Sequence, residues 1–169
     1  MILNPNEKYY KFCPNCKAEL QKKDKDKVEC LYCPNCDFVF WNNPKPVVSI
    51  VLHKNNKVLM LQRKNEPHKG YWCLPGGYIN YNETLEEAIK RETLEEAGLN
   101  IDVGKLVGVY RIDNDPRGIN IDIIYEGCLE GEIKISDEHE KYELYLQDKL
   151  PTNIAYKHRE AINDWYKIK

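Results

Sequence analysis

The sequence lacks a long apolar segment. No apolar run within its 169 residues approaches the ~20 residues that a membrane-spanning helix needs. Met1–Lys8 also lacks the apolar core that a secretory signal peptide carries. These two absences predict a soluble, cytoplasmic protein that has no membrane partner.

The sequence also lacks an excess of charge of either sign. Its 27 acidic residues against 25 lysines and arginines give a net charge of −2, so a broad basic surface for nucleic acid is not expected. Hydrophobic residues make up 42% and charged residues 31%, a balance typical of a folded chain rather than a disordered one. The length allows one ordinary domain, or one domain with a small added module.

The composition changes near Asn42–Pro46. Residues 1–43 are polar, rich in lysine and poor in aliphatic side chains, whereas apolar runs separated by turn residues begin at Val47. Two prolines in the intervening segment restrict the backbone to extended conformations, which suits a linker that leads into a strand. The sequence therefore predicts a small domain over residues 1–43 and a larger one over residues 44–169.

Five of the seven cysteines lie within the first 36 residues. The tetrapeptide Cys-Pro-Asn-Cys occurs twice there, and its two-residue spacer lets both thiolates of a pair bind one ion. Four thiolates make a closed tetrahedral site typical of structural Zn²⁺, which stabilises a module of about 45 polar residues that is too small for a sufficient core. The predicted ligands are Cys13, Cys16, Cys33 and Cys36. Cys30 is an alternative to Cys33, because Cys30-Leu31-Tyr32-Cys33 has the same spacing. We interpret the module as a metal-stabilised structural element rather than a nucleic-acid-binding one.

Alternating and continuous apolar runs beyond the linker predict several strands and two helices. Strands are expected at Val47–Leu52, Lys57–Gln62, Tyr71–Leu74, Lys105–Ile112, Ile119–Leu129 and Tyr142–Leu146, with a hairpin turn at Asn55–Asn56. Helices are expected at Thr84–Ala97 and Ile154–Ile168, the second after the N-cap candidate Thr152. His158 lies on the apolar stripe of that helix and is interpreted as a packed core residue. The order indicates an α+β or layered α/β/α domain.

The helix at Thr84–Ala97 carries carboxylates on a face that should point inward. Thr84 and Glu87 form a capping box, and Gly98 is the expected stop. The same face is apolar in the first two turns and acidic in the last two, where side chains three and four residues apart are neighbours. The acidic residues are Glu92, Glu95 and Glu96.

Buried carboxylates need a cation, and hard oxygen ligands at this density fit Mg²⁺ or Mn²⁺. Arg91 cannot be a ligand, so its guanidinium is expected to orient a carboxylate, either Glu83 or Glu95. A solvent-exposed acidic face is the alternative, but Glu86 and Lys90 already provide the exposed side of this helix.

At this point the residues resemble a known family. Gly77, Glu83 and Arg91–Leu99 together match the Nudix box, Gx5Ex7REUxEExGU, where U is a bulky aliphatic residue. Thr93 departs from the pattern at the first U position, which should affect packing more than chemistry. With Trp72–Gly76 similar to the usual approach strand and the cysteine module in front, nearly the whole chain resembles the zinc-ribbon Nudix hydrolases. The resemblance implies a Nudix α/β/α sandwich behind a zinc ribbon.

The resemblance implies hydrolysis of a nucleoside diphosphate linked to another group, with water attacking a phosphorus atom. The glutamates of the box would hold the divalent ions, and the carbonyl of Gly76 or Gly77 would complete the coordination shell, because glycine lets backbone approach an ion closely. Glu92 is one candidate for the general base. Glu138 and Glu140 are the others, since Ser136–Lys141 resembles the acidic distal loop of the family, although it also fits a solvated loop.

The substrate is less well determined by the sequence. Pro116 and Arg117 lie near the position of a proline typical of ADP-ribose pyrophosphatases, which favours a nucleotide sugar such as ADP-ribose. The proline-rich motif of NADH pyrophosphatases is missing. Arg63 is a candidate for a phosphate contact, and Tyr71, Trp72 and Tyr110 are candidates for base stacking, with solvated charge or core packing as the alternatives.

Two other functions compete with this prediction. One is hydrolysis of NADH, capped RNA ends or damaged nucleoside triphosphates by the same chemistry. The other is a non-catalytic nucleotide sensor or nucleic-acid-binding regulator that has kept the fold, although such a protein would be expected to lose box carboxylates that are all present here. A homodimer is compatible with the sequence but is not indicated by it.

Overall fold

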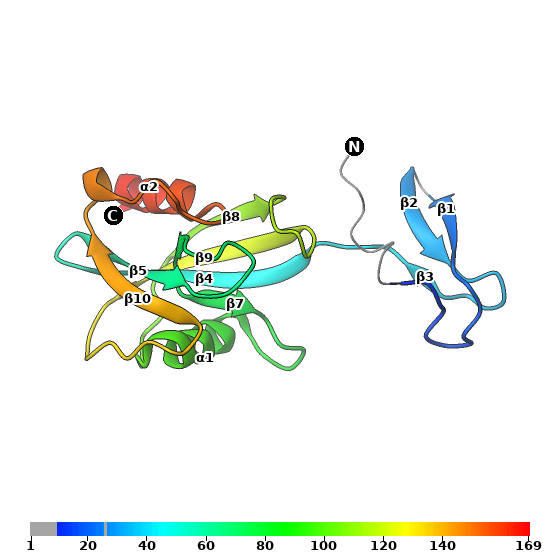
Figure 1. The fold of residues 1–169 in the computed structure, drawn as a ribbon, viewed down its shortest axis with the longest axis horizontal. Helices are drawn as coiled ribbons and strands as arrows, with labels where there is room; N and C mark the ends of the chain where they lie inside the picture. Colours follow the sequence, from blue (N-terminus) through cyan, green and yellow to red (C-terminus); the bar gives the residue numbers. More distant parts are fainter. Residues whose placement is uncertain (1–9, 26) are drawn as a thin grey trace. The chain divides into compact units, whose positions relative to one another are not determined.

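The computed structural model describes residues 10–25 and 27–169, and it divides the chain into two compact units. One unit comprises the described residues up to Pro44 together with Pro116–Gly118, and the other comprises Lys45–Asp115 and Ile119–Lys169 (Figure 1). The N-terminal segment Met1–Lys8, interpreted above for its lack of a signal core, lies outside the described residues. None of the helices in the described part of the chain is long and apolar enough to span a membrane.

The first unit is a three-stranded antiparallel sheet built on a very small core. Its strands are β1 (Gln21–Lys25), β2 (Val28–Tyr32) and β3 (Val39–Phe40), in that spatial order. The core consists mainly of two leucines and two cysteines, with partly buried aromatic rings beside them. A core of this size buries too little apolar surface to stabilise a fold by itself.

The second unit is a mixed sheet whose longest strands run through its centre. The path of strands is β10 (His139–Tyr145), β5 (Lys57–Arg63), β4 (Lys45–Lys54), β9 (Asn120–Cys128) and β8 (Leu106–Ile112). The short strands β6 (Trp72–Cys73) and β7 (Gly76–Tyr78) pair with β5 and β4 respectively. Only β4 and β9 pair in parallel. The predicted strands are confirmed, with ends that differ by at most three residues.

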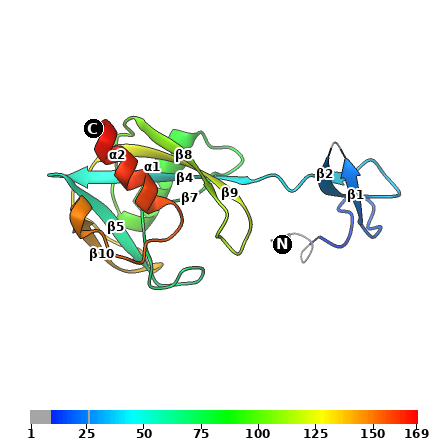
Figure 2. The ribbon, with the colours of Figure 1, turned by 90° about the horizontal axis from the view of Figure 1, so that it is seen from above.

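Two helices cover opposite faces of this sheet, so the predicted α/β/α layering is confirmed (Figures 1 and 2). Because successive side chains of a strand point to opposite faces, β4 contributes to two cores. Val48 and Ile50 pack with residues of α1 (Leu85–Ala97), whereas Val51 packs with residues of α2 (His158–Ile168). A 3-10 helix, η2 (Gln147–Lys149), precedes α2.

Helix α1 has the ends that its sequence predicts. The Thr84 side chain accepts a hydrogen bond from the Glu87 amide, and the Glu87 carboxylate accepts one from the Thr84 amide, which completes the capping box. Gly98 ends the helix in the left-handed conformation with φ 69°. The hairpin turn between β4 and β5 is also confirmed, because Asn55 and Asn56 have positive φ angles of 51° and 61°.

The prediction for the start of the last helix is wrong. Helix α2 begins at His158, four residues after the predicted start, and Thr152 does not cap it. Residues 153–155 are extended instead and pair with β6: the Trp72 amide donates to the Asn153 carbonyl at 2.9 Å, and the Ala155 amide donates to the Trp72 carbonyl at 2.9 Å. Backbone pairing with a distant strand therefore overrides the local helical pattern.

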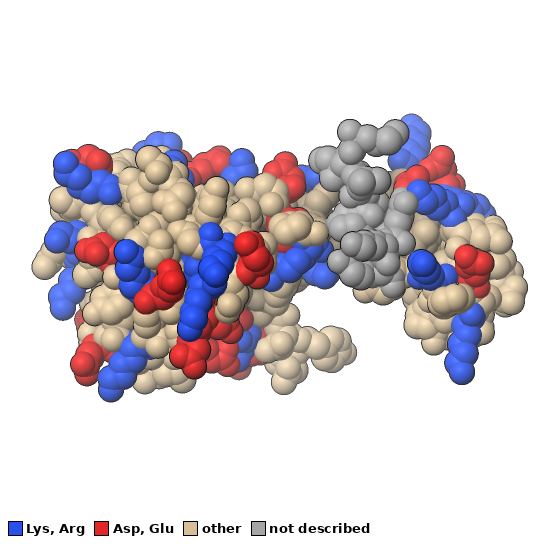
Figure 3. Space-filling view, viewed as in Figure 1, with Lys and Arg blue, Asp and Glu red and all other residues tan. Residues whose placement is uncertain are grey.

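Charged side chains are mixed over the surface of the second unit. In Figure 3 lysines and arginines alternate with aspartates and glutamates over the visible face of this unit, with no extended area of one sign. This distribution agrees with the balanced composition and offers no broad electrostatic surface for nucleic acid on that face.

Candidate active site

The last two turns of α1 bring two carboxylates against the glycines of β7. The Glu96 Oε2 atom accepts a hydrogen bond from the Gly76 amide at 2.9 Å, and only 8% of Glu96 is exposed. Glu92 is also mostly buried, and a Cβ atom added to Gly77 would lie 2.5 Å from the Glu92 Oε1 atom. A side chain at position 77 would therefore displace the Glu92 carboxylate from this place.

Glu95 lies at the edge of the site rather than inside it. Its side chain is 58% exposed, and its Oε2 atom is 3.1 Å from Nη1 of Arg91. Among the described residues, only the four cysteines of the first unit form a group of three or more potential ligands within 4.8 Å of one another. The three glutamates of the box thus share one side of α1, but only Glu92 and Glu96 converge on β7.

Arg91 connects the carboxylates of this region. Its Nε and Nη2 atoms donate to the two oxygens of Glu83 at 2.5 and 3.0 Å, and its Nη1 atom donates to Glu92 at 2.8 Å and to Glu95 at 3.1 Å. Nη2 also donates to the carbonyl of Tyr78 at 3.0 Å, which ties α1 to β7. Arg91 therefore orients both of the carboxylates between which the sequence left the choice open, and Glu92 in addition.

The electrostatics of the site differ sharply between its carboxylates. The bidentate hydrogen bonds from Arg91 lower the pKa of Glu83 to about 2. Burial, together with the charges of Glu92 and Glu138, raises the pKa of Glu96 to about 8. The hydrogen bond from the Gly76 amide opposes this shift. Burial also raises the pKa of Glu92, although Arg91 opposes this shift.

The donor set fits a divalent cation. Besides the Gly76 amide, the His139 side chain lies near Glu96, with its Nε2 atom 3.9 Å from the Glu96 Oε1 atom. Burial lowers the pKa of His139 to about 4. His139 is therefore uncharged at neutral pH and does not neutralise the carboxylate. The buried carboxylate of Glu96 and the mostly buried one of Glu92, beside a glycine backbone, present hard oxygen ligands with unfavourable mutual repulsion, which a divalent cation would relieve.

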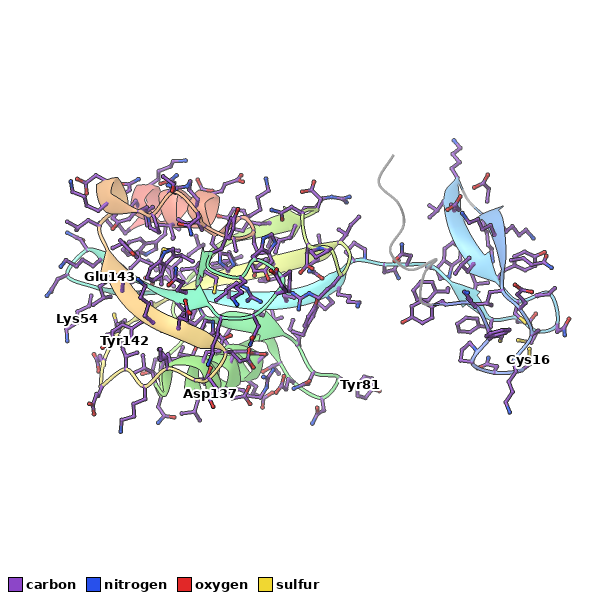
Figure 4. All side chains as sticks on the ribbon, viewed as in Figure 1. Cys16, Lys54, Tyr81, Asp137, Tyr142 and Glu143 are labelled. Carbon is purple, nitrogen blue, oxygen red and sulfur yellow. The ribbon has the colours of Figure 1, made fainter. Side chains whose placement is uncertain are left out.

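The connection between β9 and β10 brings one more acid to this site. It packs on the end of α1, where the Ser136 amide donates to the Glu96 carbonyl at 3.1 Å. The charge of Glu138 raises the pKa of both Glu92 and Glu96, so its carboxylate is near enough to act on both. Glu140 is exposed and falls at the register shift between His139 and Lys141 in β10. Figure 4 labels Asp137 in this loop, close to α1.

The candidate substrate contacts are in different environments. Arg63 is half-buried at the end of β5, where its Nε atom donates to the Pro67 carbonyl at 2.8 Å and its charge lowers the pKa of Glu96. Tyr71 is 42% exposed and is free to contact a ligand. Trp72 is 5% exposed and meets the ring of Tyr145 edge to face at 5.2 Å, so it is a packing residue.

Of the remaining candidate substrate contacts, one is buried and two are exposed. Tyr110 is buried and donates to Asp164 at 3.1 Å. Pro116 and Arg117 are exposed in the connection between β8 and β9. Tyr81, in the loop between β7 and α1, is fully exposed and points away from the unit in Figure 4.

Two buried side chains behind Glu96 were not singled out from the sequence. The Cys73 Sγ atom lies 3.8 Å from the His139 Nε2 atom, and burial raises the pKa of Cys73 to about 12. These residues come from β6 and β10, 66 positions apart, and no spacing motif connects them. Their only signal in the sequence was the position of His139 within the acidic Ser136–Lys141 segment.

The first unit contains the four-cysteine group (Cys16 is labelled in Figure 4). The Cys13 and Cys36 sulfurs are 3.6 Å apart, the Cys16 and Cys33 sulfurs are 3.3 Å apart, and all four lie within 4.8 Å of one another. This is the arrangement of a tetrahedral all-thiolate metal site. Cys30 is outside the group, since its sulfur donates to the Lys23 carbonyl at 3.3 Å.

Comparisons with known proteins agree with this geometry. The model of the NUDIX domain family matches residues 43–165. An ADP-ribose pyrophosphatase of Methanocaldococcus jannaschii is 40% identical over 129 residues, which cover 75% of this chain and 76% of that protein.

Solved structures resemble this one as well. The crystal structure of a NUDIX hydrolase from Nitrosomonas europaea superposes with a TM-score of 0.81 and 27% identity, covering 94% of this chain and 92% of that one. The NUDIX domain of Shewanella oneidensis NrtR complexed with ADP ribose, at 23% identity and a TM-score of 0.64, covers 81% of this chain and 93% of that one and shares the fold.

Proposed function

The chain belongs to the NUDIX family of hydrolases, and from this premise we propose that it cleaves the pyrophosphate of ADP-ribose. The observation that carries the proposal is the pair of carboxylates against the backbone of Gly76–Gly77, the mostly buried Glu92 and the buried Glu96. His139, beside Glu96, is uncharged at neutral pH. The choice of ADP-ribose is supported by the 40% identity to an ADP-ribose pyrophosphatase over three quarters of both chains.

The divalent-metal site of the proposal is built from α1 and β7. Glu92 and Glu96 would hold Mg²⁺ or Mn²⁺ together with the Gly76 or Gly77 carbonyl, and Glu95 would contribute from the edge. A bound ion there supplies positive charge for the diphosphate and lowers the pKa of a coordinated water. Arg91 keeps Glu92 and Glu95 in place, and the Gly76 amide holds one oxygen of Glu96.

The reaction consumes one water. Its oxygen attacks one phosphorus of the pyrophosphate, the bridging P–O bond breaks, and ADP-ribose and water become AMP and ribose 5-phosphate. Glu138 is our choice of general base, because its charge acts on both Glu92 and Glu96. Glu138 and Glu140 are both exposed, but Glu140 lies at the register shift of β10. Glu92 is less suited to accept a proton, since Arg91 donates a hydrogen bond to it at 2.8 Å.

Two further parts of the proposal lie outside the carboxylate cluster. Cys13, Cys16, Cys33 and Cys36 would bind Zn²⁺ in a structural role, because a closed site of four thiolates has no open position for a water. For the substrate, Arg63 is the candidate for a phosphate contact and Tyr71 for stacking on the base. Pro116 and Arg117 remain candidates for the nucleotide-sugar side.

The substrate is tested by comparing ADP-ribose, NADH, NAD-capped RNA and 8-oxo-dGTP in the presence of Mg²⁺. We expect kcat/KM for ADP-ribose to exceed that for each of the others by about tenfold or more, as for a site that recognises polar groups of its substrate. A higher kcat/KM for NADH or capped RNA would replace the proposed substrate. Binding of ADP-ribose without turnover of any compound would instead identify a nucleotide sensor.

The base is tested in the same assay with two neighbouring variants. Glu138→Gln should lower kcat by about 10²–10⁴-fold with ADP-ribose, the usual range for loss of a general base. Glu140→Gln is the matched control and should stay within about threefold of the parent protein. Equal losses in the two variants, or a full kcat for Glu138→Gln, would reject Glu138 as the base.

A further inference from the structure

A buried polar network on the α2 side of the sheet contacts the segment that leads into the active site. The network consists of Ser49 on β4, Asp122 on β9 and His158 at the start of α2, and each is at most 4% exposed. Ser49 Oγ donates to Asp122 Oδ2 at 3.1 Å, and His158 Nε2 lies 3.2 Å from the same oxygen. Polar side chains that are buried this completely are costly to fold unless they satisfy one another.

One hydrogen bond extends the network to the chain between β6 and β7. The Leu74 amide donates to the His158 Nδ1 atom at 2.9 Å. Because Nδ1 accepts, the ring proton must be on Nε2, which directs it to Asp122. Asp122 therefore fixes the tautomer and the orientation of the imidazole, as carboxylates do for histidines in many functional sites.

Leu74 needs this partner because of its place in the sheet. β6 ends at Cys73 in its pairing with β5, and β7 begins at Gly76 in its pairing with β4. Only Leu74 and Pro75 separate the two pairings. Proline has no amide hydrogen, so Leu74 carries the single amide of this connection, and His158 accepts from it.

The connection ends where the glutamate site begins. Two residues after Leu74, the Gly76 amide donates to Glu96 Oε2 at 2.9 Å. Ser49 packs closely against Gly76 as well. A Cβ atom added to Gly76 would lie 2.7 Å from the Ser49 Oγ atom and 2.2 Å from the Val48 carbonyl oxygen. The network thus holds Leu74 by a hydrogen bond and packs closely on Gly76, from the opposite side of the sheet.

We propose that His158, oriented by Asp122 and Ser49, is a positioning residue of the active site. By fixing the Leu74 amide it sets the backbone of Leu74–Gly76, and through Gly76 it sets the Glu96 carboxylate. This role rests on the metal site described under the proposed function, but not on the identity of the substrate. His158 touches neither substrate nor the reacting atoms.

Two substitutions, each of which keeps a polar atom at one of the two imidazole nitrogen positions, separate a positioning role from simple packing. In His158→Asn the Oδ1 atom takes the place of Nδ1 and can still accept from Leu74, whereas in His158→Gln the amide nitrogen takes the place of Nε2 and keeps only the contact with Asp122. Ile162→Val, a buried change in the same helix, is the control for loss of stability alone.

The first readout is hydrogen exchange of the Leu74 and Gly76 amides in the metal-free protein, measured by NMR. The second is binding of Mn²⁺ followed by electron paramagnetic resonance, and the third is the Mg²⁺ concentration for half-maximal activity. His158→Gln should accelerate exchange of both amides and weaken metal binding by about tenfold or more, the range found when residues that orient metal ligands are changed. His158→Asn should recover most of both properties, and Ile162→Val should change neither.

Two outcomes would overturn the proposal. One is an equal loss of metal binding in His158→Asn and His158→Gln at equal thermal midpoints. The other is faster exchange of Leu74 in His158→Gln with unchanged Mn²⁺ affinity. A parent protein that binds Mn²⁺ but does not cleave ADP-ribose would refute the substrate assignment alone, because exchange and Mn²⁺ binding are measured without substrate.

Discussion

Glu96 is the residue at which folding and function conflict most directly. A buried carboxylate with a pKa of about 8 is protonated in much of the metal-free protein at neutral pH, yet a metal ligand must be ionised. Metal binding and loss of this proton are therefore coupled, so the apparent affinity for a divalent ion should rise as the pH rises toward and through the pKa of Glu96. For the same reason, ionisation of Glu96 lowers the free energy of unfolding when no metal ion is bound.

The pH dependence of stability has a definite sign. The pKa of Glu96 is raised on folding, so its contribution is fully present below about pH 4 and is lost as the pH rises through about 8. Relative to Glu96→Gln, the metal-free parent protein should lose up to about 3 kcal/mol of unfolding free energy between pH 6 and pH 8, at about 1.4 kcal/mol per pH unit. Urea unfolding at both pH values measures this difference.

The kcat of Glu96→Gln should fall at least about 100-fold. Substitution of residues that only orient metal ligands already lowers activity or metal affinity about 10- to 100-fold. Glu95→Gln is the control for stability in the same helix turn, since its carboxylate is largely exposed. A Glu96→Gln protein that is as active as the parent, or whose stability follows the parent's pH profile, would contradict the role given to this carboxylate.

Sequence reasoning located some of these side chains and missed others for a physical reason. Helical periodicity gives the direction of a side chain, and it placed Glu92 and Glu96 inward correctly. It does not show where the covering strand ends, so the exposure of Glu95 was not foreseen. The contact between Leu74 and His158 joins residues 84 positions apart, and no local pattern encodes such a contact.

At the scale of elements, α1 and α2 show when local signals decide a boundary. The capping box and the C-terminal glycine of α1 act within one helical turn, and the structure confirms both. Helix α2 carries Thr152 and an apolar stripe, yet β6 pairs with residues 153–155 and delays the helix to His158. An N-cap without a side-chain hydrogen bond, as in α2, indicates that tertiary contacts fix the start of that helix.

The two helix starts therefore predict different costs for the same substitution. Thr84→Ala should lower the free energy of unfolding by about 1 kcal/mol, because it removes the capping hydrogen bond to Glu87. Thr152→Ala is the matched control and should change it by less than about 0.5 kcal/mol. Equilibrium urea unfolding at pH 7 measures both, and equal effects of the two substitutions would refute this account of the boundaries.

At the scale of the whole molecule, the two units are stabilised by different means. The second unit has two apolar cores, one on each side of its sheet. The first unit has only a few buried side chains around the cysteines. A small module of this kind gains its stability from metal coordination, so we expect it to unfold when the proposed Zn²⁺ is removed.

Two cysteine variants test this difference. Cys33→Ser should lose the bound zinc and unfold the first unit, because three thiolates hold the ion less tightly and the core alone is insufficient. Cys30→Ser should retain zinc, since the Cys30 sulfur lies outside the four-cysteine group. Metal content by mass spectrometry and the NMR signals of both units measure the outcome. Retained zinc in Cys33→Ser would make Cys30 the ligand in its place.

The two-residue connection at Leu74–Pro75 also limits how the chain can change its length. One residue inserted there would shift β7 by one position against β4. This shift would turn Gly77 away from Glu92 and bring Pro75 to the position of Gly76, where a Cβ atom would lie 2.2 Å from the Val48 carbonyl oxygen. One residue deleted would bring Tyr78 to the position of Gly77, where a Cβ atom would lie 2.5 Å from the Glu92 Oε1 atom. Insertions and deletions should therefore occur in loops such as Lys64–Gly70 rather than in this connection, and the spacing from Trp72 to Gly77 should stay constant among functional variants.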